Sequence, residues 1–104
     1  MITKATDSVS GTRDSLTGYE EVEIEGRFGD DIQVLLETRP IKAGRALAFV
    51  VVVRDLRAAD VKDPVKKAYE AAMGMTVTEL NNFFPDEVDE LDADQPVTPE
   101  GKGD

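Results

Sequence analysis

The densest group of side chains that could bind a metal or transfer protons lies near the C-terminus. It comprises six carboxylates: Asp86, Glu87, Asp89, Glu90, Asp92 and Asp94. A calcium loop needs Asp or Asn at alternating positions, followed by a glycine and a glutamate at fixed offsets. Gln95 and Pro96 break that spacing. A carboxylate hydrolase needs a rigid pocket that raises one pKa, and this polar segment offers none. We therefore expect a solvated acidic segment without a metal.

Nucleophilic catalysis has few candidate residues. The 104 residues include no Cys and no His, which excludes disulfides, thiolate nucleophiles and the usual zinc ligand sets. Ser8, Ser10 and Ser15 thus have no imidazole to activate them. Gly101 and Gly103 do not lie between a strand and a helix, as a phosphate-binding loop requires. The sequence predicts a non-enzymatic protein that binds no cofactor.

Charge and hydropathy limit the kinds of partner that the protein is expected to bind. The formal net charge is −10, and 8 of the 22 acidic residues lie in residues 85–104. An acidic protein repels phosphate backbones, so we expect no nucleic-acid partner. The longest apolar run has eight residues, too few to span a bilayer, and no apolar signal segment opens the chain. These features predict a soluble intracellular protein.

The most apolar of the segments that must form the fold is the run "RALAFVVVVR". Residues 46–53 are uncharged between Arg45 and Arg54. The four valines of residues 50–53 favour a strand, because β-branched side chains lose rotamer freedom in a helix. The alanines, the leucines and the length of segment 43–57 favour a buried helix. We expect the helix and keep the strand as the alternative.

Residues 17–28 are also ambiguous. Alternating residues favour a strand: Val22, Ile24, Gly26 and Phe28. Thr17 and Glu20 instead fit a capping box at a helix start, and the early glutamates favour the positive end of the helix dipole. We favour a helix that Gly29 interrupts. In the next segment, Pro40 moves Arg39 out of helical geometry, and residues 41–44 are expected to be a connector.

Two further helices have clear boundaries. The first has Asp63 as N-cap, Pro64 at its first position and Gly74 just past its end. The second opens with a capping box, Thr76 to Glu79, and stops at Pro85. The expected architecture is therefore mainly α. A helical domain of about four helices over residues 16–84 follows a flexible N-terminal arm, residues 1–15, and precedes a disordered acidic tail, residues 85–104.

Two apolar groups are candidates for partner binding. They are Leu47, Val50 and Val51 of the central segment, and Leu80, Phe83 and Phe84 of the last one. Helically spaced apolar residues usually form a core. A helix that is apolar nearly all round in so short a chain also suggests that a partner covers one side. Both interpretations stay open, as does assembly into a homo-oligomer.

Three stretches resemble a known family: "LTGYEEVEIEGRFG", "RALAFVVVVRD" and "AYEAAMGMTVTELNNFF". They are similar to the tail assembly chaperones of long-tailed bacteriophages, especially those of actinobacterial hosts. The resemblance covers about residues 16–84. The segment "DLRAADVKDPVKK" departs from the family pattern, which has an acidic or Arg-Arg continuation at that point.

The resemblance implies a non-enzymatic assembly factor in the host cytoplasm that is absent from the mature virion. Its implied partners are the tape measure protein, the major tail protein that polymerises around it, and a longer form of the chaperone made by a programmed frameshift. Residues 100–102, "EGK", are compatible with a slippery codon run. The alternatives are a structural virion protein, such as a head–tail connector or tail completion subunit, and an acidic inhibitor of a basic partner.

Overall fold

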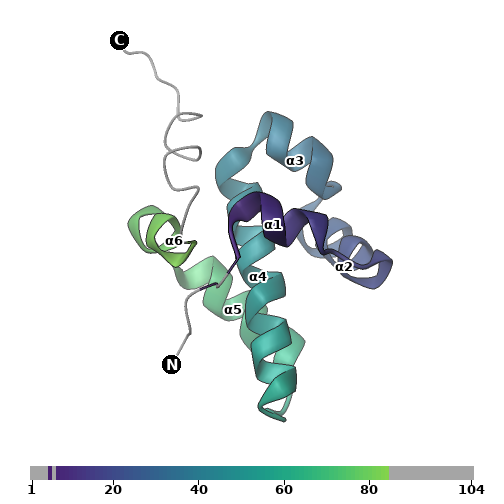
Figure 1. Cartoon of the computed structure of the whole chain (residues 1–104), viewed down its shortest axis with the longest axis vertical. Coiled ribbons are helices and arrows are strands. Elements are labelled where there is room, and N and C mark those ends of the chain that lie inside the picture. The colour runs from purple at the N-terminus through teal and green to yellow at the C-terminus, as the bar shows by residue number, and fades with distance from the viewer. Residues whose placement is uncertain (1–4, 6, 85–104) are drawn as a thin grey trace.

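The computed structural model describes residue 5 and residues 7–84 (Figure 1). The expected acidic tail, its carboxylates, the stop at Pro85 and the "EGK" stretch lie outside the described residues. The described part is mainly helical, as predicted. It contains six helices: α1 (Val9–Asp14), α2 (Gly18–Phe28), α3 (Ile32–Thr38), α4 (Pro40–Ala58), α5 (Pro64–Gly74) and α6 (Val77–Phe83). The sequence predicted about four; the short helices α1 and α3 are additional.

Helix α4 is the centre of the fold and contacts each of the other five helices. The valine-rich run lies within it, so the predicted helix is confirmed and the strand alternative is wrong. Its buried residues are Ala43, Gly44, Ala46, Leu47, Ala48, Phe49, Val50, Val52 and Val53. Burial on several sides outweighs the small helix penalty of the valines. The expected connector at residues 41–44 is instead helical, because Pro40 suits the first turn of a helix.

Helix α2 forms as its capping signals predicted. The backbone N–H of Glu20 donates to Thr17 Oγ1 at 3.2 Å, and the N–H of Thr17 donates to Glu20 Oε1 at 2.9 Å. Gly29 ends the helix with a φ of 92°, a left-handed conformation that glycine adopts without a Cβ clash. Ile24 and Phe28 face the core, which resolves the helix–strand ambiguity in favour of the helix.

Helix α1 corrects part of the prediction that residues 1–15 form a flexible arm, since Val9–Asp14 are helical, whereas residues 1–4 and 6 lie outside the described residues. Ser8 caps this helix by accepting the N–H of Gly11 at 3.0 Å. Val9 and Thr12 are buried, and α1 packs across α4 (Figure 1). Six residues are too few for a stable isolated helix, so the packing stabilises α1. That tertiary contribution is absent from local sequence patterns.

The last two helices meet at a tight corner. Pro64 opens α5 as predicted, but Asp63 makes no side-chain capping bond because its backbone is left-handed, with a φ of 52°. Gly74 is the last residue of α5 rather than the residue after it. The Thr76–Glu79 capping box of α6 is confirmed in both directions, at 2.8 and 3.0 Å.

Candidate functional site

The predicted partner-binding residues are mostly core residues. Leu47, Val50, Leu80, Phe83 and Phe84 are each at most 4% exposed, and Val51 is partly buried against the same core. They form no exposed apolar face, because they pack with residues of the other helices in one hydrophobic core. Val50 nevertheless lines a groove, and Phe83 lines a second, separate concavity.

An aromatic cluster joins the groove-lining residue Phe49 to residues of α2 and α5. The ring of Phe49 on α4 lies 5.7 Å from that of Phe28 on α2 and 6.3 Å from that of Tyr69 on α5, both edge-to-face. The Arg27 guanidinium lies over the Tyr69 ring, 5.5 Å from its centroid. Edge-to-face pairs and a cation above an aromatic face are favourable geometries. The cluster therefore fixes α2 and α5 against α4.

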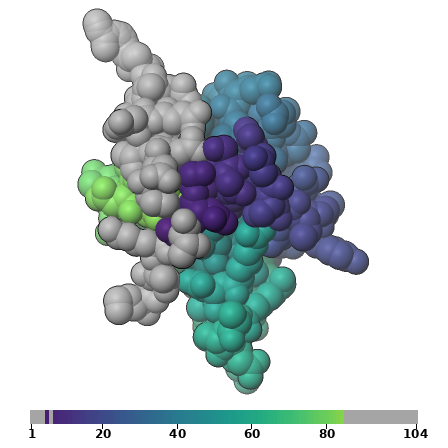
Figure 2. All heavy atoms as spheres, viewed as in Figure 1, coloured from purple at the N-terminus to yellow at the C-terminus, as the bar shows by residue number. Residues whose placement is uncertain are grey.

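The groove lies between α2, α4 and α5 and has a volume of about 1050 Å³. Its apolar lining residues are Tyr19 and Val22 from α2, Phe49, Val50 and Val53 from α4, and Val65 from α5. Tyr19 is 90% exposed and Val22 is 69% exposed. Figure 2 shows α2, in dark blue, projecting from the side of the molecule beyond the teal α4 and α5. A buried apolar floor beside two exposed apolar side chains suits an apolar partner.

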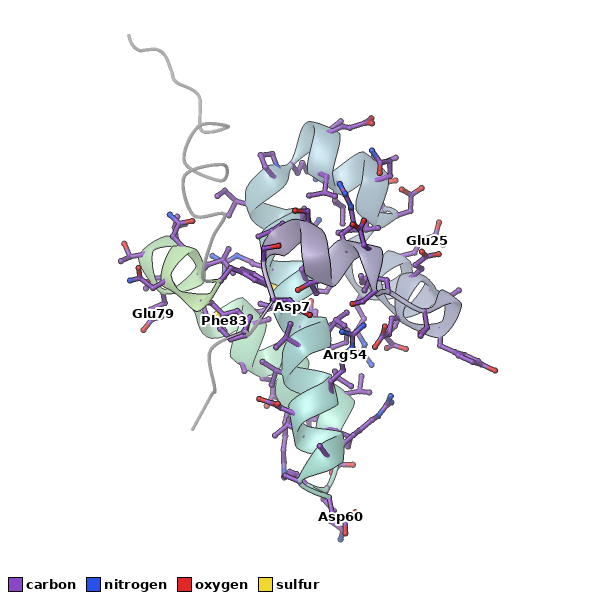
Figure 3. All side chains as sticks on the ribbon, in the orientation of Figure 1. Asp7, Glu25, Arg54, Asp60, Glu79 and Phe83 are labelled. Atoms are coloured by element: carbon purple, nitrogen blue, oxygen red, sulfur yellow. The ribbon has the colours of Figure 1, made fainter. Side chains whose placement is uncertain are left out.

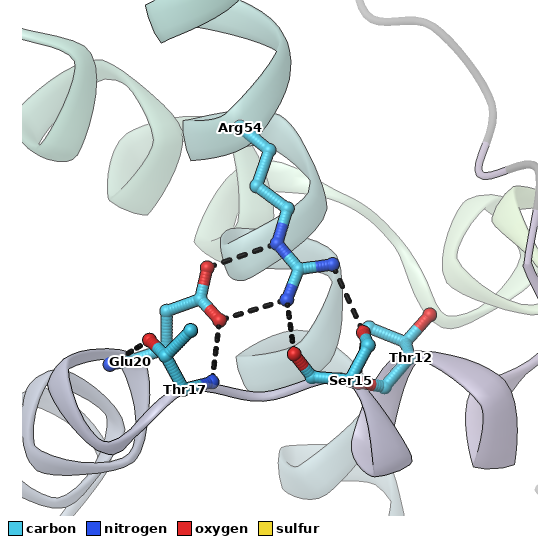
Figure 4. A network of polar contacts seen from close by, with 5 residues as sticks. All are labelled: Thr12, Ser15, Thr17, Glu20 and Arg54. Carbon is cyan, nitrogen blue, oxygen red and sulfur yellow. Dashed lines mark hydrogen bonds and ion pairs between the residues drawn. The ribbon is translucent and has the colours of Figure 1, made fainter.

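An ion pair fixes one rim of the groove (Figure 4). Arg54 of α4 donates from Nε and Nη2 to the two carboxylate oxygens of Glu20, at 2.9 and 2.7 Å. Its Nη1 and Nη2 also donate to Oγ and the carbonyl oxygen of Ser15, both at 3.1 Å. The hydrogen bonds from Arg54 lower the pKa of Glu20, and the same pairing raises the pKa of Arg54. Glu20 is therefore an anion at neutral pH, and the charge-assisted pair holds α2 to α4 at this rim.

Sequence reasoning missed Tyr19 and Val22, although a signal was present. Once Thr17 and Glu20 define the helix start, a helical projection places Tyr19 roughly opposite the core residues Ile24 and Phe28. A tyrosine on the outer face of a surface helix marks a contact candidate. In the sequence, Val22 belongs only to the alternating strand pattern.

The described residues hold no candidate metal site. In residue 5 and residues 7–84, no three His, Cys, Asp or Glu side chains gather as a metal site would require. Over that same part of the chain, no helix is both long and apolar enough to cross a membrane. The arrangement can bind another surface, and its groove is the leading candidate site.

The sequence matches no family model, no curated protein and no solved structure.

Proposed function

We propose that this protein is a bacteriophage tail assembly chaperone that binds the tape measure protein and promotes polymerisation of major tail subunits around it, without catalysing a reaction. The single observation that carries the proposal is the open apolar groove beside Tyr19 and Val22, whose side chains are 90% and 69% exposed. The similarity of residues 16–84 to such chaperones supports the same conclusion.

The physical mechanism follows from the groove's shape and chemistry. Tape measure proteins are long and helical, so each can present an amphipathic helix with apolar side chains at i, i+3 and i+4. A volume of about 1050 Å³ accommodates several such side chains. Burying each large apolar side chain contributes about 1.5–3 kcal/mol before the entropy of association is subtracted. The chain's net charge of −10 keeps the complex from aggregating.

The proposal also covers where the chaperone acts and when it leaves the assembling tail. The chaperone acts in the host cytoplasm, is released before the virion matures, and works beside its longer frameshifted form. Major tail subunits then replace it on the tape measure protein.

The direct test is co-expression of a tagged chain with tape measure fragments, followed by pull-down and assay of fragment solubility. Val22→Ala and Tyr19→Ala should each reduce recovery of soluble fragment severalfold. Val77→Ala is the matched control, because Val77 is also an exposed valine but lies on α6, away from the groove. Equal recovery with Val22→Ala and Val77→Ala would remove the groove from the mechanism.

The alternatives make different predictions. A structural virion protein would be found in purified particles by mass spectrometry, whereas a chaperone would be absent from them. An acidic inhibitor would lose binding when residues 85–104 are deleted, whereas the groove's apolar contact would persist.

A further inference from the structure

A second concavity, separate from the groove, lies at the corner between α5 and α6 and has a volume of about 550 Å³. It shares no lining residue with the groove. Its lining residues are Glu70, Ala71, Gly74, Met75, Glu79, Asn82 and Phe83. Figure 3 shows Glu79 and Phe83 on α6, on the other side of the molecule in this view from Glu25 of α2. The proposed chaperone function does not use this surface.

Hydrogen bonds from α4 hold the corner in a fixed shape. Arg45 of α4 donates from Nη1 to the carbonyl oxygens of Ala72 and Met75, at 3.0 and 2.7 Å. Those carbonyls lie at the C-terminal end of α5, where a cation is also favoured by the helix dipole. The Thr76–Glu79 capping box fixes the start of α6. A site that is already ordered loses little conformational entropy when a ligand binds.

The floor and the rim of this concavity differ in chemistry. Met75 and Phe83 are buried apolar residues, and Ala71 is partly buried beside them. Glu70 of α5 and Glu79 of α6 are exposed. No basic side chain of the described residues forms an ion pair with either carboxylate. One oxygen of Glu79 accepts the Thr76 N–H, which leaves its other oxygen for a partner.

We propose that the α5–α6 corner binds a lysine or arginine side chain presented by an amphipathic, basic segment of a partner protein. The aliphatic stem of such a side chain packs on Met75 and Phe83. Its cationic end reaches the carboxylates of Glu70 on α5 and Glu79 on α6, which both line the concavity. Both carboxylates would repel an acidic segment, and a purely apolar segment would leave them unpaired. Charge complementarity therefore selects a basic segment.

Peptide binding with charge-neutralising variants tests the proposal. The probes are a fluorescein-labelled 15-residue helical peptide with leucine and lysine at helical spacing, and the same peptide with glutamate in place of lysine. We expect the lysine peptide to bind the full chain at low salt and the glutamate peptide not to bind. The double variant Glu70→Gln/Glu79→Gln should weaken binding of the lysine peptide about fivefold or more. Glutamine at position 79 still serves a capping box, so α6 keeps its start.

The matched control is Glu21→Gln/Glu25→Gln, which removes two exposed carboxylates from α2 and changes the net charge equally. We expect it to weaken binding by less than about twofold, through long-range attraction alone. If both pairs weaken the lysine peptide equally, the attraction belongs to the acidic protein as a whole and the site is refuted.

A steric variant provides an independent test. A Cβ added at Gly74 meets no atom within 4 Å, so Gly74→Leu should fill the concavity without distorting α5. Gly26 has the same open surroundings and lines neither concavity, so Gly26→Leu is the control. We expect only Gly74→Leu to weaken the lysine peptide. Peptide-induced amide shifts that cluster on α2 instead of residues 70–83 would overturn the assignment.

Discussion

Arg54 and Glu20 join the two main walls of the groove through a two-pronged ion pair, with donor–acceptor distances of 2.9 and 2.7 Å (Figure 4). Glu20 is also the third residue of α2 and accepts the Thr17 N–H at the helix start. One carboxylate therefore both starts α2 and attaches it to α4. The position of Tyr19 depends on this contact, because Tyr19 lies in the same helical turn.

Glu20→Gln should remove the ion pair and leave the capping box intact, since glutamine also serves that box. Arg54 is 37% exposed, so solvent screening limits the loss to about 1 kcal/mol of unfolding free energy. Urea denaturation measures this loss. Glu79→Gln is the control, because Glu79 closes a second capping box without an arginine partner. A larger loss in Glu79→Gln than in Glu20→Gln would contradict the assigned role of Arg54.

The same ion pair makes stability depend on pH on the acid side. The hydrogen bonds from Arg54 lower the pKa of Glu20 below its ordinary value of 4.5. The native state therefore favours the carboxylate, and its contribution is complete above pH 4.5 and lost as pH falls through the lowered pKa. Thermal melts below pH 4.5 should show a smaller acid-induced decrease in Glu20→Gln than in wild type. Parallel decreases in the two proteins would show that other carboxylates dominate.

Local signals in the sequence predicted the helix ends well. The Thr17–Glu20 and Thr76–Glu79 pairs are capping boxes in the structure, and Gly29 ends α2 in a left-handed conformation. Each signal lies within four residues of the feature it predicts, so no tertiary information is required. The failure at Asp63 has a local cause too, since its backbone is left-handed rather than extended, as a capping residue requires.

The rest of the fold and the groove depend on contacts between residues that are distant in the sequence. Helix α1 forms because Val9 and Thr12 pack against α4, and this packing is not encoded within residues 9–14 alone. Leu47 and Phe84, which the sequence placed among the partner-binding candidates, are likewise buried in a core assembled from several helices. The groove could not be predicted because it exists only where α2, α4 and α5 meet.

Leu47→Ala and Tyr19→Ala should separate stability from binding. Leu47 is completely buried, so its truncation should cost about 2–5 kcal/mol of unfolding free energy by loss of burial and by cavity formation. Tyr19 is 90% exposed, so its truncation should change stability by no more than about 0.5 kcal/mol. Chemical denaturation gives both values. A large stability loss in Tyr19→Ala would mean that its ring is part of the core.

Arg45→Met should destabilise the corner between α5 and α6. It removes the hydrogen bonds to the carbonyl oxygens of Ala72 and Met75 while keeping an apolar stem of similar length. Losing charged donors to partly buried carbonyls should cost about 1–3 kcal/mol. Hydrogen exchange should accelerate in residues 72–80 more than in α2. Lys67→Met, at an exposed position on α5, is the control and should leave exchange unchanged.

Alanine substitutions at Gly29 and Gly26 should change the stability of the protein in opposite directions. Gly29 has a φ of 92°, and an alanine there should cost about 1–2 kcal/mol because its Cβ crowds the following carbonyl oxygen. The nearest side-chain atom, Lys42 Nζ, would lie 3.8 Å from that Cβ, so the penalty comes from the backbone rather than from a clash.

Gly26 lies inside α2 with open space around it. Gly26→Ala should therefore stabilise the protein by about 0.5–1 kcal/mol. Thermal denaturation of the two variants measures both effects, and a shift in the same direction for both would contradict the left-handed end of α2.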